Sequence, residues 1–252
     1  MSFKIIGHRG DKANFVENTI AGFKSSLYEE GIDGIELDVV VSKDKKLLIS
    51  HDMFMKDSLG NRQNIYELTY AELLTANKAL QTETVSDEMR YPLLEELLSL
   101  YSTQKNKKIL LLEIKSLPSL EVPPLSVPEL IKKVHYCLKL YGIEGDKCII
   151  ISFDYRVIEE SYKQNAKHPI GLILHRNLMP LACIVDRLNL SLLVMEKGWI
   201  VKEQVLEMLE KKIDIYIWTV NTEEDWKYLE SMGVQGMITD KPQTLTKYKV
   251  KK

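Results

Sequence analysis

The feature that most constrains the fold is a regular alternation of short apolar segments with amphipathic ones. Eight runs have the composition and the period of two residues that are typical of strands. They cover residues 4–7, 34–41, 108–114, 147–152, 170–174, 191–195, 213–220 and 236–239. Six segments with helical spacing lie between them, at residues 18–28, 93–101, 127–140, 155–162, 201–210 and 222–229. The sequence therefore predicts strands that alternate with helices.

Eight such units in a chain of 252 residues match the size of a closed (β/α)8 barrel, in which the first and last strands pair. The main alternative is an open, doubly wound sheet. Against it, the first strand-to-helix turn, at residues 7–14, lacks the G-x-G-x-x-G pattern of a nucleotide-binding sheet of that kind. We therefore predict an α/β fold, a TIM barrel in which residues 1–252 form a single domain.

One segment interrupts the alternation after the second strand. Residues 53–91 are too many for a barrel connection and contain one short amphipathic stretch, at residues 66–76. We interpret residues 53–91 as a small insertion that covers the mouth of the barrel. A second long, proline-rich connection at residues 118–128 is expected on the same face.

Composition and charge disfavour several classes of protein. The 34 Lys and Arg residues nearly balance 36 Asp and Glu, so no overall field attracts nucleic acid. No apolar run approaches the roughly 18 residues of a membrane-spanning helix, and we expect no stable membrane insertion. We also expect no cleaved signal peptide. Three widely spaced cysteines favour reduced thiols and a cytoplasmic protein. The oligomeric state does not follow from the sequence.

Two carboxylates on the second strand are the first candidate functional groups. Alternate side chains of a strand share a face, so Glu36 and Asp38 point one way and their apolar neighbours the other. Carboxylates this close repel in a low dielectric, and a cation relieves the repulsion. Oxygen ligands favour Mg²⁺ or Ca²⁺ over zinc. The alternative is that both side chains reach solvent on an edge strand. Glu113 and Lys115 share a face of the next strand in the same way.

The barrel prediction can be tested within the sequence, because catalytic groups of TIM barrels lie where strands end. Polar or aromatic groups follow most of the predicted strands. They are His8, Glu36 with Asp38, Glu113 with Lys115, residues 152–154, Trp218 with Thr219, and Asp240. His51 follows a further short apolar run, L-L-I-S at residues 47–50. None of these strand ends carries a convincing activated serine or cysteine.

The order of these groups closely resembles the pattern of the glycerophosphodiester phosphodiesterase family, which runs H-R-G, E-N-T, E-x-D, H-D and E-x-K. The matching residues are His8-Arg9-Gly10, Glu17-Asn18-Thr19, Glu36-Leu37-Asp38, His51-Asp52 and Glu113-Ile114-Lys115. Further similarity at residues 152–154, 218–221 and 239–242 extends the likeness over nearly the whole chain.

This resemblance implies a TIM barrel with a small insertion after the second strand. It implies a divalent cation, Mg²⁺ or Ca²⁺, held by Glu36, Asp38 and Glu113, with His8 and His51 as the acid/base pair. The implied partner is a small-molecule phosphodiester, a glycerophosphodiester that is cleaved to an alcohol and glycerol 3-phosphate. Two alternatives are a lysophospholipase D or phospholipase C-like lipid phosphodiesterase of the same fold, and a catalytically silent binding barrel. The intact histidines and carboxylates disfavour the silent barrel.

Four further residues are expected to contact the substrate. Arg9 and Lys115 would supply cations for the non-bridging oxygens of the phosphodiester, which gain charge in the transition state. The alternatives are a surface arginine and a lysine that only neutralises Glu113. Phe153 and Trp218 would form an apolar wall for glycerol or a lipid moiety, and barrel packing accounts for them equally well.

Three other positions have weaker expectations. Glu17 is either close to the metal or a helix N-terminal residue favoured by the helix dipole. Asp11 stands where the family usually has a small residue and is expected to add a carboxylate near the site. Outside these motifs, His135, His168 and His175 are interpreted as structural.

Overall fold

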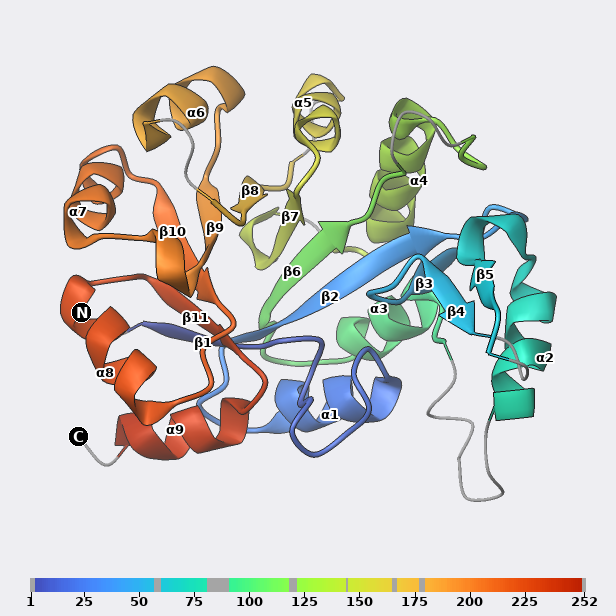
Figure 1. Ribbon diagram of the computed structural model, residues 1–252, viewed down its shortest axis with the longest axis horizontal. Helices are drawn as coiled ribbons and strands as arrows, with labels where there is room; N and C mark the ends of the chain where they lie inside the picture. Colours follow the sequence, from blue (N-terminus) through green and yellow to red (C-terminus); the bar gives the residue numbers. More distant parts are fainter. Residues whose placement is uncertain are drawn as a thin grey trace.

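The computed structural model describes residues 3–56, 60–80, 91–117, 122–143, 145–164, 167–176 and 180–250. Parallel strands form a closed barrel (Figure 1). In spatial order they are β1 (Lys4–Gly7), β2 (Gly34–Val41), β6 (Ile109–Ile114), β7 (Cys148–Ser152), β8 (Ile170–Leu174), β9 (Leu192–Glu196), β10 (Asp214–Trp218) and β11 (Gly236–Thr239). Because β1 pairs with both β2 and β11, the barrel prediction is confirmed and the open-sheet alternative is wrong.

Helices surround the barrel on its outside (Figure 1). They are α1 (Ile20–Tyr28), α3 (Leu94–Ser102), α4 (Val127–Leu140), α5 (Tyr155–Lys163), α6 (Leu181–Leu188), α7 (Lys202–Glu210), α8 (Glu223–Met232) and α9 (Pro242–Val250). All six predicted helices are present, whereas α6 and α9 were not predicted. In the described part of the chain, no helix combines the length and apolar character needed to cross a bilayer.

The strands separate two layers of apolar side chains. On β2, Ile35, Leu37 and Val39 belong to the large core between the barrel and the helices. A second cluster fills the barrel interior, with Ile6, Ile109, Leu111, Ile151, Ile173, Leu192, Val194, Tyr216 and Ile238. The interior is therefore a packed core, and the functional site of such a barrel is expected above it, at the carboxyl ends of the strands.

A hairpin extends β2 beyond the barrel. Strand β3 (Leu47–Ile49) runs antiparallel to β2 and pairs with residues 39–41. The Ser50 N–H then donates a hydrogen bond to the Asp38 carbonyl oxygen at 3.0 Å. This return of the chain brings His51 back to the strand end that carries Glu36 and Asp38.

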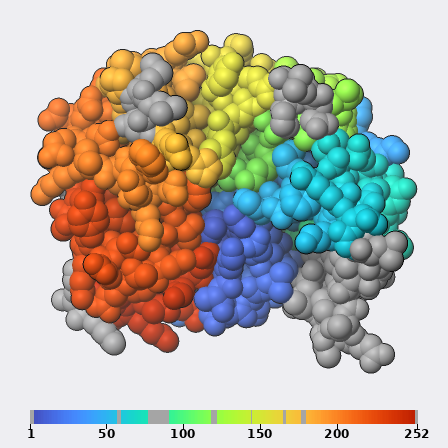
Figure 2. Space-filling view, in the orientation of Figure 1, coloured from blue at the N-terminus to red at the C-terminus, as the bar shows by residue number. Residues whose placement is uncertain are grey.

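The insertion lies beside the barrel mouth. Its described part comprises β4 (Phe54–Lys56), β5 (Arg62–Asn64), the 3₁₀ helix η1 (Ile65–Glu67) and α2 (Tyr70–Leu80). These elements share a small core with the β2–β3 hairpin, made of Val40, Leu48, Met55, Ile65 and Leu73. They lie to one side of the barrel (cyan in Figures 1 and 2), and Met53, Ile65 and Tyr66 share the lining of a groove with Lys115. Residues 57–59 and 81–90 of the predicted insertion lie outside the described residues.

A glycine makes room for the largest side chain of the barrel interior. Tyr216 is fully buried, and a Cβ on Gly236 would lie 2.6 Å from its ring. We predict that Gly236→Ala lowers the free energy of unfolding by about 1–3 kcal/mol, because overpacking a core costs about that much. Urea denaturation measures the change, and Gly198→Ala is the control because a Cβ there meets nothing within 4 Å. Equal urea midpoints for Gly236→Ala and Gly198→Ala would contradict the close packing of Gly236 against the Tyr216 ring.

Candidate active site

Most residues of the candidate active site stand two residues further along a strand than a side chain of the barrel interior. Because strand side chains alternate, the residue two positions after an interior residue points to the same side of the sheet. His8 thus follows Ile6, and Glu113 follows Leu111. The complete set is His8, Glu36 with Asp38, Glu113, Phe153, His175, Glu196, Trp218 and Asp240. The barrel alternation therefore places the chemical groups directly above the core.

A cavity of about 340 Å³ opens at this end of the barrel. Among the predicted site residues, its lining includes His8, Arg9, Glu36, His51, Glu113, Phe153 and Trp218. Asp38 is buried beside Glu36 and Glu113, and Lys115 lines the adjacent grooves. The residues predicted from separate motifs are thus assembled in one place.

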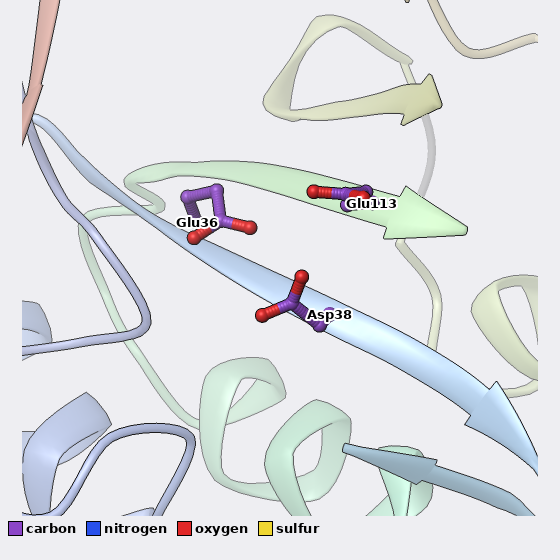
Figure 3. A group of neighbouring side chains, drawn as sticks. All are labelled: Glu36, Asp38 and Glu113. Atoms are coloured by element: carbon purple, nitrogen blue, oxygen red, sulfur yellow. The ribbon is translucent and has the colours of Figure 1, made fainter. Parts of the chain in front are cut away.

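Three buried carboxylates converge on one point. Glu36, Asp38 and Glu113 each offer an oxygen, and these oxygens lie within 4.8 Å of one another. Figure 3 shows the side chains on β2 and β6, and the register places Asp38 directly opposite Glu113. Strand β2 is buried along its whole length and paired on both sides, so the solvent-exposed edge strand considered above is wrong.

Two cations partly compensate this cluster. The Lys115 Nζ lies 2.8 Å from Asp38 Oδ1 and also contacts Glu113 Oε1. The Arg9 Nε lies 3.4 Å from Asp38 Oδ2, and the Arg9 backbone N–H donates to Glu36 Oε2 at 3.0 Å. Two positive charges thus face three carboxyl groups.

Burial and the neighbouring charges shift the pKa values of the three carboxyl groups. Burial, with the charges of Asp38 and Glu113, raises the pKa of Glu36 well above its usual value. Burial and the Asp38 charge raise the pKa of Glu113 to about 7. Although burial opposes it, the contacts with Lys115 and Arg9 lower the pKa of Asp38. In the metal-free protein, protons on the glutamates relieve part of the repulsion.

The cluster fits a divalent cation. With the three carboxyl groups ionised, one negative charge is left uncompensated in a buried position, which is costly without a partner. A divalent ion would change the net charge of the cluster with Arg9 and Lys115 from one negative to one positive. That positive charge would match the single negative charge of a phosphodiester. Donors that are all carboxylate oxygens suit a hard ion of this charge.

His8 is held by a half-buried carboxylate, that of Asp240. Its Nδ1 lies 2.6 Å from Asp240 Oδ1, and Asp240 also accepts a hydrogen bond from Asn221 Nδ2 at 2.7 Å. Although burial opposes it, these hydrogen bonds lower the pKa of Asp240, so it is a carboxylate and Nδ1 carries the proton. The other ring nitrogen, Nε2, lies 4.0 Å from Glu36 Oε2 and is available in the cavity.

His51 has a similar arrangement. Its Nδ1 lies 2.9 Å from Asp52 Oδ1, which leaves Nε2 for the cavity. Burial lowers the pKa of His51, and the Lys115 and Arg9 charges add to this effect although Asp38 opposes it. His51 is therefore neutral near pH 7, so its Nε2 can accept a proton.

The weaker expectations have different outcomes. Glu17 accepts from Arg9 Nη1 at 2.8 Å and contacts Lys12 Nζ at 2.6 Å, so it holds Arg9 and does not join the acidic cluster. Helix α1 begins after Thr19, whose hydroxyl accepts from the Gly22 N–H. The expectation for Asp11 is wrong, because its buried carboxylate faces the helices and accepts hydrogen bonds from Asn14, Ser25 and Gln243.

The structure also brings together residues that sequence reasoning did not assign. Asn18 Nδ2 donates to Asp38 Oδ2 at 2.8 Å, which orients that carboxylate. His175, interpreted above as structural, lines the cavity beside Phe153 and Trp218. Its Nδ1 lies 3.6 Å from Glu196 Oε2. His175 stands two residues after Ile173, and Glu196 two residues after Val194. The alternation of the strand could therefore have identified both as residues of the cavity end.

The fold and the site together define a class of protein. A TIM barrel with clustered buried carboxylates and two histidines near the carboxyl ends of its strands is typical of an enzyme with a site for a divalent cation. Residues 8–244 match the model of the glycerophosphoryl diester phosphodiesterase family. The chain belongs to this family of phosphoric diester hydrolases.

Individual relatives agree with this assignment. The chain is 30% identical to the glycerophosphodiester phosphodiesterase of Caldanaerobacter subterraneus subsp. tengcongensis, over 97% of both chains. It is 27% identical to the human lysophospholipase D GDPD1, over 96% of this chain and 84% of that protein. An Oleispira antarctica phosphodiesterase, solved with the product sn-glycerol-3-phosphate, has the same fold with a TM-score of 0.77. That structure is 21% identical and covers 97% of this chain and 95% of its own.

Metal binding should change how stability depends on pH. The raised pKa values of Glu36 and Glu113 make the metal-free folded state bind protons more tightly than the unfolded chain does. This stabilisation is fully present below the unfolded pKa, about 4.5, and is lost as pH rises through about 7. An ion that replaces those protons should therefore raise Tm more at about pH 8 than at about pH 5.

The measurement is the Tm of chelator-treated protein with and without Mg²⁺ or Ca²⁺ at both pH values. We expect the difference at the higher pH to exceed that at the lower pH by at least about 3 °C. Glu113→Gln should remove most of the metal effect, whereas Glu129→Gln, an exposed residue at the start of α4, should not. Equal shifts at both pH values would argue against binding by these carboxylates.

Proposed function

We propose that the chain hydrolyses small glycerophosphodiesters to an alcohol and glycerol 3-phosphate with the help of a bound Mg²⁺ or Ca²⁺. The observation that carries this proposal is the convergence of three buried carboxylates and two Asp-held histidines on one cavity. The name of the Caldanaerobacter relative and the glycerol phosphate in the Oleispira structure support the substrate class. In this proposal residues 1–252 act as one domain, with residues 53–91 as its insertion.

Glu36, Asp38 and Glu113 would hold the ion. When bound, a divalent cation supplies Lewis-acid polarisation of a phosphoryl oxygen and positive charge for the transition state. Asn18 fixes Oδ2 of Asp38, and Oδ1, which Lys115 contacts in the free protein, would be the ligand oxygen. The protein contributes oxygen ligands that are already in position.

Arg9 and Lys115 have two successive roles in this proposal. In the free enzyme they neutralise the carboxylates at the distances given above. Once the carboxylates are satisfied by the ion, both side chains can turn toward the non-bridging oxygens of the phosphodiester. Arg9 lines the cavity, and Glu17 limits its movement through the 2.8 Å hydrogen bond.

His8 and His51 act as the acid/base pair. Departure of an alkoxide near neutral pH needs a general acid, and activation of a hydroxyl needs a base. A neutral His51 suits the first proton abstraction, and His8, whose Nδ1 is held by Asp240 and whose Nε2 is available in the cavity, is assigned to protonation of the leaving oxygen. The two roles exchange in a second, hydrolytic step.

The substrate's own hydroxyl is the proposed nucleophile. The described residues that line the cavity include no serine, threonine or cysteine. A glycerol hydroxyl next to the phosphorus gains effective molarity that an outside nucleophile lacks. His51 removes its proton as the oxygen bonds to phosphorus, and His8 protonates the departing alcohol. The cyclic glycerol phosphate that results is then opened by water.

A lysophospholipid substrate is the second candidate, and the human relative named lysophospholipase D supports it. Turnover of glycerophosphocholine compared with a lysophospholipid distinguishes the two. A cytoplasmic location belongs to our proposal as well. Its support is that Cys137, Cys148 and Cys183 are all free thiols.

Replacing either histidine tests the acid/base assignment. We predict that His8→Ala and His51→Ala each lower kcat for glycerophosphocholine by about 10²-fold or more, the usual contribution of a general acid or base. Phosphorus NMR follows the formation of glycerol 3-phosphate, and Tm shows that each variant is folded. His168→Ala is the control, because His168 lies at the opposite end of β8 from the cavity and should keep the parent kcat. If a folded His8→Ala or His51→Ala variant kept the parent kcat, the acid/base assignment of that histidine would be wrong.

The nucleophile has its own test. We predict that a glycerophosphocholine analogue without the attacking glycerol hydroxyl is not hydrolysed, because the internal attack is lost. Phosphorus NMR of the natural substrate should show a transient cyclic phosphodiester. Hydrolysis of the deoxy analogue at a comparable rate would mean that water attacks directly.

A further inference from the structure

A network of hydrogen bonds joins the turn after β7 to the end of β6. The two strands are parallel neighbours, with Ile151 opposite Glu113. The buried Ser152 hydroxyl donates to the Ile114 carbonyl oxygen at 2.8 Å. The same hydroxyl accepts a hydrogen bond from the Asp154 N–H at 3.1 Å. The chain thus leaves β7 in a fixed direction, which brings Asp154 beside the end of β6.

Asp154 is the centre of this network. Its Oδ2 accepts a hydrogen bond from the Ser116 hydroxyl, and its Oδ1 accepts one from the Arg156 N–H at 2.9 Å. The Arg156 guanidinium donates to both oxygens and, through Nη2, to the Leu117 carbonyl oxygen at 3.1 Å. Although burial opposes it, the hydrogen bonds from Arg156 and Ser116 lower the pKa of Asp154. Asp154 is therefore a carboxylate near pH 7, and its bonds to Arg156 are charge-assisted.

This network holds the main chain on both sides of Lys115. One bond is to Ile114, the residue before it, and the others reach Ser116 and Leu117, the two residues after it. The Lys115 N–H itself donates to the Val39 carbonyl oxygen at 2.9 Å. Residues 114–117 are thus tied to β2 on one side and to the turn between β7 and α5 on the other.

Helix capping alone does not account for the network. An N-cap needs only the hydrogen bond between Asp154 Oδ1 and the Arg156 N–H. The bonds to Ser116 and, through Arg156, to Leu117 cross to a segment 38 and 39 residues earlier in the chain. These additional bonds fix residues that α5 does not contain.

Lys115 has a particular need for a fixed main chain. Its ammonium lies at the end of a flexible four-carbon stem and is held by contacts with Asp38 and Glu113. In the proposed reaction these carboxylates bind the cation, and Lys115 turns toward the phosphate. Its position then depends on the main chain from which it extends. A displacement of about 1 Å at a reacting group can lower a rate by about 10²-fold.

We propose that Asp154 is a positioning residue, which acts on Lys115 through residues 114–117. Its carboxylate, with Ser116 and Arg156, fixes the main chain so that the Lys115 ammonium meets the non-bridging oxygens of the phosphodiester. Asp154 touches no substrate itself. This inference rests on the proposed function, because the contact between Lys115 and the phosphate belongs to that reaction.

A double-mutant cycle tests whether Asp154 acts through Lys115. We would measure kcat and KM for glycerophosphocholine with Asp154→Ala, Lys115→Met and the variant that carries both changes. Asp154→Ala should lower kcat by about 10-fold or more in the parent. In the Lys115→Met background it should lower kcat by less than about 2-fold, because residues that act as one unit are not additive. Effects that multiply, or a folded Asp154→Ala variant with the parent kcat, would overturn the proposal.

Three further variants separate positioning from stability. Thr222→Ala is the matched control, because it removes the N-cap of α8, whose hydrogen bond to the Asp225 N–H stays within that helix. It should lower Tm and keep the parent kcat. Ser116→Ala should lower kcat by about 5-fold, and Ser116→Thr, which keeps the hydroxyl, should not. If Asp154→Ala does not fold, Ser116→Ala takes its place in the cycle with Lys115→Met.

The turn also carries Phe153, so the cycle is repeated in a Phe153→Leu background. There the effect of Asp154→Ala on kcat should persist. If it disappears with Phe153→Leu and persists with Lys115→Met, Asp154 acts on the aromatic residue and the proposal is wrong.

Calorimetry with glycerol 3-phosphate and Mg²⁺ tests the same coupling without turnover. Asp154→Ala should weaken binding of this product by about 5-fold in the parent and leave it unchanged in the Lys115→Met background. Equal weakening in both backgrounds would overturn the proposal while the proposed hydrolysis stands. If the coupling is found in a protein that hydrolyses no glycerophosphodiester, the proposed function is wrong and the effect of Asp154 on Lys115 remains.

Discussion

Repulsion among three buried carboxylates is the constraint on which the rest of the site depends. Glu36, Asp38 and Glu113 are brought together by the register of β2 and β6, and burial makes their charges expensive. Arg9 and Lys115 lie against them for this reason. Two cations are one too few, and burial together with this uncompensated charge accounts for the raised pKa values of Glu36 and Glu113 and for the fit to a divalent ion. In the proposed reaction, the metal, the phosphate and the positive side chains would be parts of one electrostatic balance.

The strand alternation connects this balance to the stability of the fold. Interior residues such as Leu111 and Ile173 pack the barrel, and the side chains two positions later form the site. The same strands carry both sets, so the core holds the site groups without long loops. His51 reaches the cavity differently, through the β2–β3 hairpin. Its position therefore depends on the local turn as well as on the barrel.

Much of this arrangement could be predicted from the sequence, because short parallel strands leave a clear apolar pattern and their ends carry polar motifs. The eight strands and the location of carboxylates and histidines near strand ends followed from that pattern, whereas the three-carboxylate metal site and the acid/base pair were implied by the resemblance to the family. Helix α9 was not predicted because its lysine-rich sequence resembles a solvated terminus. The position of the insertion depends on tertiary packing against Val40 and Leu48, which no local pattern shows. His175 and Glu196 belong to no motif, and they come to lie beside other site residues only because the barrel closes.

The central claim is that the three carboxylates bind one divalent ion, and the most direct test is to locate that ion. Crystals of the protein grown with Mn²⁺, which takes oxygen ligands as Mg²⁺ and Ca²⁺ do, would give an anomalous signal at the metal position. The account predicts one strong peak within bonding distance of oxygens from Glu36, Asp38 and Glu113, and loss of this peak in Glu113→Gln. Active crystals with no peak among these carboxylates, or with the only peak elsewhere, would contradict it.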